Sequence, residues 1–138
     1  MVKSTSPAHD AATATPVGAP DRVVSGHGDF ALAVRRFPSP RALQGHPALI
    51  YAHGFGQTRG AWNRTGQAMA AHGYPGLAYD ARGHGDSDRN AADQPYTGDQ
   101  FADDLIVVAG EQPEPPVLVG ASMGGLFGLI AGSRWPGL

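Results

Sequence analysis

The chain has 138 residues, with ten lysine and arginine residues against twelve aspartate and glutamate residues, and no cysteine. A chain of this length holds one domain with a modest core, and its formal net charge of −2 gives no general attraction to nucleic acid or anionic membranes. Without cysteine, disulfides, thiolate metal sites and a cysteine nucleophile are excluded.

The first 20 residues are mostly small and polar, and they contain no continuous apolar stretch. A secretory signal needs about 7–15 apolar residues in a row, and a membrane span needs about 20. Neither pattern occurs in the sequence. We therefore predict a disordered extension over residues 1–20, one domain over residues 21–138, a cytoplasmic location and no membrane contact.

The remaining sequence alternates between strand and helix patterns. Two short segments on either side of His27–Asp29 predict a β-hairpin over residues 22–37. Short apolar runs predict three strands buried on both faces, at 48–51, 75–81 and 117–121. Apolar residues at helical spacing predict three helices, at 61–73, 97–112 and 123–135. This order predicts an α/β fold with a mostly parallel sheet and flanking helices.

The segment Gly120–Gly124 reads G-A-S-M-G and fits the G-x-S-x-G pattern between a strand and a helix. Small neighbours allow the sharp turn that projects the hydroxyl of Ser122 above the sheet. The N–H groups that open the following helix stabilise negative charge as it develops. The pattern therefore predicts Ser122 as a nucleophile, with Gly120 and Gly124 supporting the turn.

The same segment is also similar to the cofactor loop of short-chain dehydrogenases, where glycines let a pyrophosphate approach a helix N-terminus. That pattern favours glycine at position 126, where this chain has Leu126. It also opens a domain and is followed by an acidic residue about 20 positions later. A nucleotide-binding oxidoreductase is thus a less favoured alternative.

A second motif, His53–Gly56, reads H-G-F-G and follows the strand predicted at 48–51. Gly54 and Gly56 allow a backbone N–H to face a reacting centre. An oxyanion hole needs such donors about 3 Å from the developing charge. We predict that the backbone amides of Phe55 and Met123 are these donors, and that His53 packs beneath the loop as a structural residue.

A third motif, residues 79–88, reads Y-D-A-R-G-H-G-D-S-D. Taken alone, it predicts a polar surface loop with a glycine turn. Asp80, Asp86 and Asp88 lack the ligand pattern and the glutamate of a calcium-binding EF-hand loop. We therefore expect neither a metal nor a cofactor.

Together, "HGFG", "YDARGHGDS" and "GASMGG", each following a predicted strand, resemble the N-terminal part of an α/β-hydrolase over residues 22–138. The resemblance implies a partial α/β-hydrolase fold that ends after the helix following Ser122. It also implies a serine hydrolase acting on a carboxylic ester or a similar acyl bond of a small-molecule substrate. Serine at this position is similar to the esterase, lipase, C–C hydrolase and haloperoxidase-like members, because the family's epoxide hydrolases and haloalkane dehalogenases carry aspartate there.

In this family the acid and the histidine of the triad follow the nucleophile in the chain. Residues 123–138 contain no Asp, Glu or His, and all six histidines precede Ser122. The resemblance therefore implies that the base and its orienting acid lie outside this sequence, and that the strand at 117–121 forms a sheet edge. Two hypotheses follow. The chain is either the first part of a longer hydrolase or a truncated form without catalytic activity.

Overall fold

The computed structural model describes residues 22–40 and 45–138, so the extension predicted over residues 1–20 lies outside the described residues. The strands are β1 (Arg22–Ser25), β2 (Ala31–Phe37), β3 (Leu49–Ala52), β4 (Gly76–Tyr79) and β5 (Val117–Gly120). The helices are α1 (Asn63–Ala71), α2 (Gly98–Gly110) and α3 (Met123–Arg134), with short 3-10 turns η1 (His27–Asp29) and η2 (Arg59–Trp62).

The strands form one sheet in the order β1-β2-β4-β3-β5. β1 and β2 are antiparallel, as expected for the hairpin, and β2 also runs antiparallel to β4. The three strands β4, β3 and β5 are parallel. The expected α/β class, with a mostly parallel sheet and an N-terminal hairpin, is confirmed.

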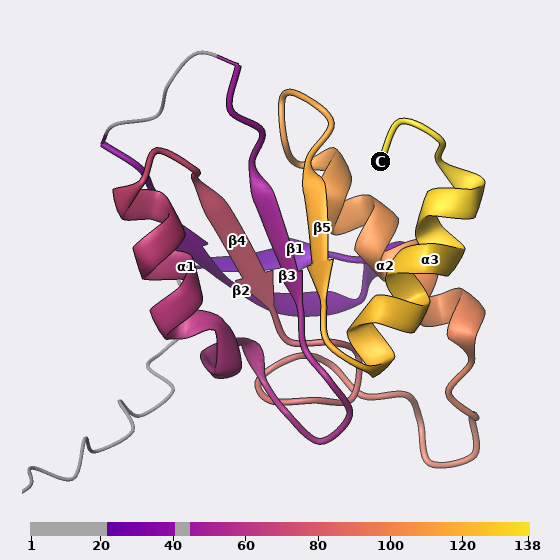
Figure 1. Cartoon of the computed structure of the whole chain (residues 1–138). Helices are drawn as coiled ribbons and strands as arrows, with labels where there is room; N and C mark the ends of the chain where they lie inside the picture. The colour runs from indigo at the N-terminus through magenta and orange to yellow at the C-terminus, as the bar shows by residue number, and fades with distance from the viewer. Residues whose placement is uncertain (1–21, 41–44) are drawn as a thin grey trace, which may run out of the picture.

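Helix α1 covers one face of the sheet, and α2 and α3 cover the other (Figure 1). The chain moves from β3 to β4 through α1, and then back past β3 to β5 through α2. Because these two steps run in opposite directions, right-handed crossovers place their helices on opposite faces. The loops that leave the neighbouring strands β3 and β5 therefore turn to opposite faces. Ligands bind at such a switch point in open α/β sheets, beyond the carboxyl ends of the strands.

Two apolar clusters, one on each face, hold the layers together. The larger joins the sheet to α2 and α3, and includes the fully buried Leu32, Ile50, Leu105 and Val108. The smaller lies under α1 around Tyr51 and Phe37. β3 is buried along its whole length, as predicted for the apolar run at 48–51.

Strand β5 departs from the prediction of a strand buried on both faces. Val117 is 47% exposed, and none of the four residues of β5 is buried. The reason is that β5 pairs only with β3 among the described strands, so it forms the sheet edge that the resemblance implied. Leu126 and Leu129 of α3, 56% and 77% exposed, continue this apolar surface.

The helix boundaries differ slightly from the predicted ranges. The helix expected at 61–73 begins with the 3-10 turn η2, and α1 proper covers only Asn63–Ala71. Thr97 caps helix α2, because its hydroxyl accepts a hydrogen bond from the N–H of Gln100, whose side chain in turn accepts one from the N–H of Thr97. In the described part of the chain, no helix is long and apolar enough to cross a membrane.

Candidate active site

The segment after β5 makes the sharp strand-to-helix turn that the sequence predicted. Ser122 has φ 50° and ψ −112°, a conformation that a residue with a side chain rarely adopts. It is exposed, and its hydroxyl has no hydrogen-bond partner among the described residues. Backbone strain of this kind persists only where the surroundings impose it, and it is common at active sites.

Two glycines allow the close packing that holds this turn in place. A Cβ atom on Gly120 would lie 2.5 Å from the backbone nitrogen of Gly125 in the first turn of α3. A Cβ atom on Gly124 would lie 2.6 Å from the carbonyl carbon of Ala52, at the end of β3. Helix α3 therefore sits directly against β3 and β5 only because both positions lack a side chain.

The loop that begins with His53 lies beside Ser122. Ala121 donates its N–H to the carbonyl oxygen of Ala52 at 3.0 Å, which aligns the two loop starts. A Cβ atom on Gly54 would lie 3.6 Å from the Cβ of Ser122. Gln57 closes the loop, because it accepts from the N–H of Gly54 and donates its own N–H to the carbonyl of Gly54, both at 3.1 Å.

The two backbone amides predicted as oxyanion donors are available for a ligand. Within residues 22–40 and 45–138, neither the N–H of Phe55 nor that of Met123 has a hydrogen-bond acceptor. Both residues line one cavity of about 370 Å³, and the side chain of Phe55 is 82% exposed. Backbone N–H groups without an acceptor beside an exposed serine are suited to bind an anion.

His53 is buried, and both of its ring nitrogens hold backbone groups. Nε2 accepts the N–H of Ala81 at 2.9 Å, and Nδ1 lies 2.8 Å from the carbonyl oxygen of Gly54. Because a backbone N–H only donates and a carbonyl only accepts, the ring is neutral with its proton on Nδ1. Burial lowers the pKa of His53, which favours the same form. This hydrogen bonding supports the predicted structural role.

His84 lies in the loop after β4 and is held in the same way. Nε2 accepts the N–H of Gly56 at 3.2 Å, and Nδ1 lies 3.0 Å from the carbonyl oxygen of Arg82. Its ring centre is 5.0 Å from that of His53 and 5.8 Å from that of Phe55. His84 thus joins the loops after β3 and β4, and neither of its nitrogens is free to accept a proton from Ser122.

The motif at 79–88 is partly buried, so the prediction of a polar surface loop is wrong. Asp80, fully buried, accepts the backbone N–H groups of Arg59 and Asp86 and pairs with the Arg59 guanidinium. Ser87 donates its hydroxyl to the Asp80 carbonyl at 2.6 Å and accepts the N–H of Ala33 at 2.9 Å. These bonds fold the loop back onto the sheet.

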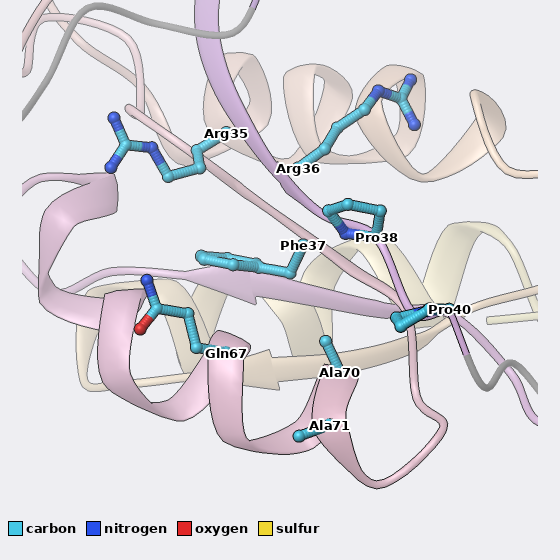
Figure 2. A pocket seen from close by; sticks show the side chains of 8 residues that line it. All are labelled: Arg35, Arg36, Phe37, Pro38, Pro40, Gln67, Ala70 and Ala71. Carbon is cyan, nitrogen blue, oxygen red and sulfur yellow. The ribbon is translucent and has the colours of Figure 1, made fainter.

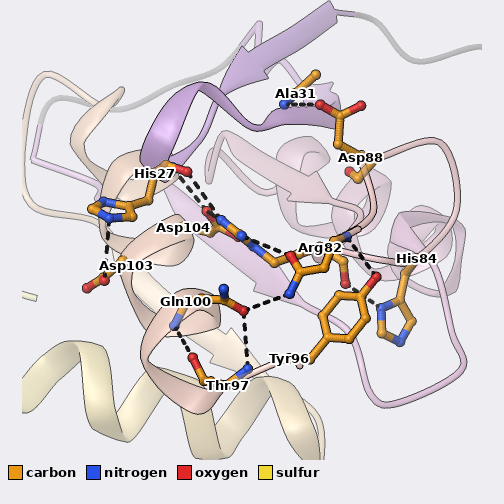
Figure 3. A network of polar contacts seen from close by, with 12 residues as sticks. His27, Ala31, Arg82, His84, Asp88, Tyr96, Thr97, Gln100, Asp103 and Asp104 are labelled. Carbon is orange, nitrogen blue, oxygen red and sulfur yellow. Dashed lines mark hydrogen bonds and ion pairs between the residues drawn. The ribbon is translucent and has the colours of Figure 1, made fainter. Parts of the chain in front are cut away.

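Arg82 forms the second buried ion pair of this loop (Figure 3). Its Nε and Nη2 donate to the two carboxylate oxygens of Asp104 at 2.9 and 3.0 Å. Asp104 also accepts the N–H of His27, and Arg82 lies over the ring of Phe30. The sequence carried a signal for Asp104, because it stands on the apolar stripe formed by Phe101, Leu105 and Val108.

A cavity of about 520 Å³ lies between β2 and α1 (Figure 2). Phe37, Pro38 and Pro40 form one wall, and Gln67 lies across from Phe37. Phe37 pairs with Gly76, the first residue of β4, so this cavity is at the opposite end of the sheet from Ser122. Among the described residues, no group of three or more His, Asp or Glu side chains could hold a metal ion.

Comparisons with known proteins show the family and the fold of the chain. The model of the family described as serine aminopeptidase, S33, matches residues 44–138. The chain belongs to this family of α/β-hydrolases. The resemblance inferred from the three motifs is therefore confirmed, and the family favours a hydrolase over the nucleotide-binding alternative.

Two curated relatives have different named activities. The chain is 40% identical to an epoxide hydrolase of Caballeronia sordidicola over 60 residues, which cover 44% of this chain and 18% of that protein. It is 39% identical to the non-heme chloroperoxidase CPO-A1 of Kitasatospora aureofaciens over 83 residues, which cover 59% of this chain and 29% of that protein. The chain therefore spans less than a third of either relative.

Solved structures also match this chain over only part of their length. A Vigna radiata epoxide hydrolase mutant superposes with a TM-score of 0.73 at 25% identity, over 84% of this chain and 35% of that one. An α/β-hydrolase from Sphaerobacter thermophilus superposes with a TM-score of 0.70 at 22% identity, over 83% of this chain and 40% of that one. Most of this chain thus corresponds to well under half of an α/β-hydrolase.

Proposed function

We propose that the protein is a serine hydrolase in which Ser122 attacks the carbonyl carbon of an ester or a similar acyl compound. The observation that carries this proposal is the strained, exposed Ser122 beside two backbone amides that lack acceptors. In the proposed reaction, Ser122 loses its proton to a base as it attacks. The amides of Phe55 and Met123 bind the oxyanion, the base returns the proton to the departing alcohol, and water then hydrolyses the acyl-serine.

The chemistry of serine favours an acyl substrate over an epoxide. Attack on a carbonyl gives an acyl-serine ester, which water hydrolyses to restore the enzyme. Attack on an epoxide carbon would give a serine ether, and water near neutral pH does not cleave an ether. The likeness to epoxide hydrolases therefore supports the fold for this chain, and Ser122 supports acyl transfer.

We propose that the base comes from outside the described residues. Among those residues, the histidines on the loops beside Ser122 are His53 and His84, and both have their two ring nitrogens bonded to backbone groups. His27 lies 4.0 Å from Asp103 of α2, His46 stacks on Tyr74, and His72 is hydrogen-bonded to the carbonyl of Ala68 at the end of α1. A serine hydroxyl needs a base to react quickly, so catalysis requires a further residue.

Hydrolysis of a p-nitrophenyl ester tests the proposal. The full-length protein should hydrolyse the ester, and Ser122→Ala should lose at least about a thousandfold in kcat/KM. Phe55→Pro removes one proposed oxyanion donor and should lose about 100-fold or more, whereas Phe55→Ala keeps the N–H and serves as its control. Hydrolysis that is unchanged in Ser122→Ala would refute the proposed nucleophile.

A further inference from the structure

A cavity beside the proposed oxyanion donors has walls made largely of rings. It measures about 370 Å³ and is lined by Phe55, Gly56, Arg82, Gly83, His84, Tyr96, Phe101 and Met123. Phe55 and Met123 supply both the proposed donors and part of the wall. A group attached to the carbonyl that Ser122 attacks would therefore reach this cavity directly.

The rings of the wall are fixed by different elements. Phe101 stacks on Phe127 of α3, with ring centres 4.5 Å apart and planes 4° apart. Tyr96 lies 6.0 Å from Phe101, and its hydroxyl accepts the N–H of Asn90. Phe55, from the loop after β3, meets His84, from the loop after β4, edge to face. Aromatic walls with such fixed orientations favour another ring as the occupant.

The cavity presents no unpaired charge. The Arg82 guanidinium donates hydrogen bonds to Asp104 and to the carbonyl of His27 (Figure 3). It also donates one to Asn90. Both ring nitrogens of His84 face backbone groups. Apart from the amides of Phe55 and Met123, which the acyl oxygen would occupy, the lining offers a charged group no free partner in return for its lost hydration, so a neutral group fits it.

The volume of the cavity also limits which groups can bind in it. An apolar cavity of about 150 Å³ in another protein binds benzene. The present cavity, at about 370 Å³, has room for a ring and its linking carbons, and an acetyl group would leave most of it empty. We propose that this cavity binds a neutral aryl group of the substrate, such as the phenyl ring of an arylacetyl ester; this inference rests on the proposed function.

Methyl NMR on the intact chain tests this binding without requiring catalysis. The probe ligands are phenylacetamide, hexanamide and acetamide, none of which reacts with serine. Phenylacetamide should shift the ε-methyl signal of Met123 saturably through the ring current. Met69 packs in the cluster on the other face of the sheet, so its methyl signal should stay in place and also report that the fold is intact. Acetamide should give no saturable shift.

A matched pair of variants locates the site. Tyr96 is 46% exposed, so Tyr96→Leu removes a wall ring without opening the core, and Tyr96→Phe keeps the ring. Phenylacetamide should bind Tyr96→Leu about 2- to 10-fold more weakly than Tyr96→Phe. Equal affinity of the two variants, equal affinity for hexanamide, or no saturable shift of Met123 would overturn the proposal. Labelling of Ser122 by a fluorophosphonate tests the proposed function separately, because neither result depends on the other.

Discussion

Ala121 donates its backbone N–H to the carbonyl oxygen of Ala52 at 3.0 Å. This bond continues the parallel pairing of β3 and β5 by one residue, beyond the pair of Ala52 and Gly120. It places the loop that carries Phe55 and the turn that carries Ser122 side by side beyond the carboxyl ends of β3 and β5. The proposed site therefore depends on how closely α3 and β3 approach each other.

The first prediction concerns that approach. Gly124→Ala should destabilise the protein by about 1–3 kcal/mol, because the new Cβ would overlap the backbone of Ala52 and force α3 outward. Gly132→Ala, in the same helix, meets no atom within 4 Å and should be neutral or stabilising by about 1 kcal/mol. Urea denaturation measures both. Equal stabilities for the two variants would show that the close approach is not required.

The second prediction concerns pH. Burial lowers the pKa of His53 below its ordinary value of 6.5. The unfolded chain therefore takes up a proton below pH 6.5 that the folded chain does not, so the stability is complete above that pH and falls as the pH decreases. The contribution of His53 should lower the free energy of unfolding by up to about 1.4 kcal/mol for each unit by which the pH decreases.

Urea denaturation at about pH 7.5 and about pH 5.5 checks this dependence. His53→Gln should reduce the difference between the two free energies of unfolding. His72→Gln replaces an exposed histidine at the end of α1 in the same way and serves as the matched control. The account of His53 fails if the two variants show the same difference as the unchanged protein.

Local patterns in the sequence were enough for most of the fold and for the turn at Ser122. The apolar run at 48–51 and the helical spacing of the apolar residues in 97–112 predict β3 and α2, because both patterns depend on residues close in the chain. The exposure of β5 could not be predicted in this way. An apolar run shows that a strand suits burial, but its neighbours decide whether it is buried.

The polar interior of the loop after β4 shows the same limit. Asp80 and Arg59 are 21 residues apart, and nothing in the loop around Arg59 marks it as a buried cation. The partnership of Arg82 and Asp104 likewise depends on how α2 packs. The turn that carries Ser122 was predictable because a strand-turn-helix motif fixes its local geometry.

The third prediction concerns the buried ion pair. Asp104→Ala should destabilise the protein by about 3–5 kcal/mol, because it leaves the Arg82 guanidinium buried without its carboxylate. Arg134→Gln breaks the exposed pairs with Asp99 and Asp103 and should change the stability far less. Thermal or urea denaturation compares them. Similar losses for the two variants would mean that burial of the pair contributes little.

The fourth prediction concerns the link between His84 and the loop carrying Phe55. His84→Phe keeps a ring beside Phe55 but removes the acceptor for the N–H of Gly56. The reaction of Ser122 with a fluorophosphonate should slow by about 2- to 10-fold. His84→Gln places an amide oxygen at a similar reach and should restore most of the rate. Two variants that react at the same rate would argue against this positioning role.

The central claim, that Ser122 is the nucleophile, is tested most directly by fluorophosphonate labelling of the full-length protein followed by peptide mass spectrometry. The account predicts one covalent adduct on Ser122 and none in Ser122→Ala. Equal labelling of the two proteins, an adduct on another residue, or ester hydrolysis by a protein whose Ser122 stays unlabelled would contradict it.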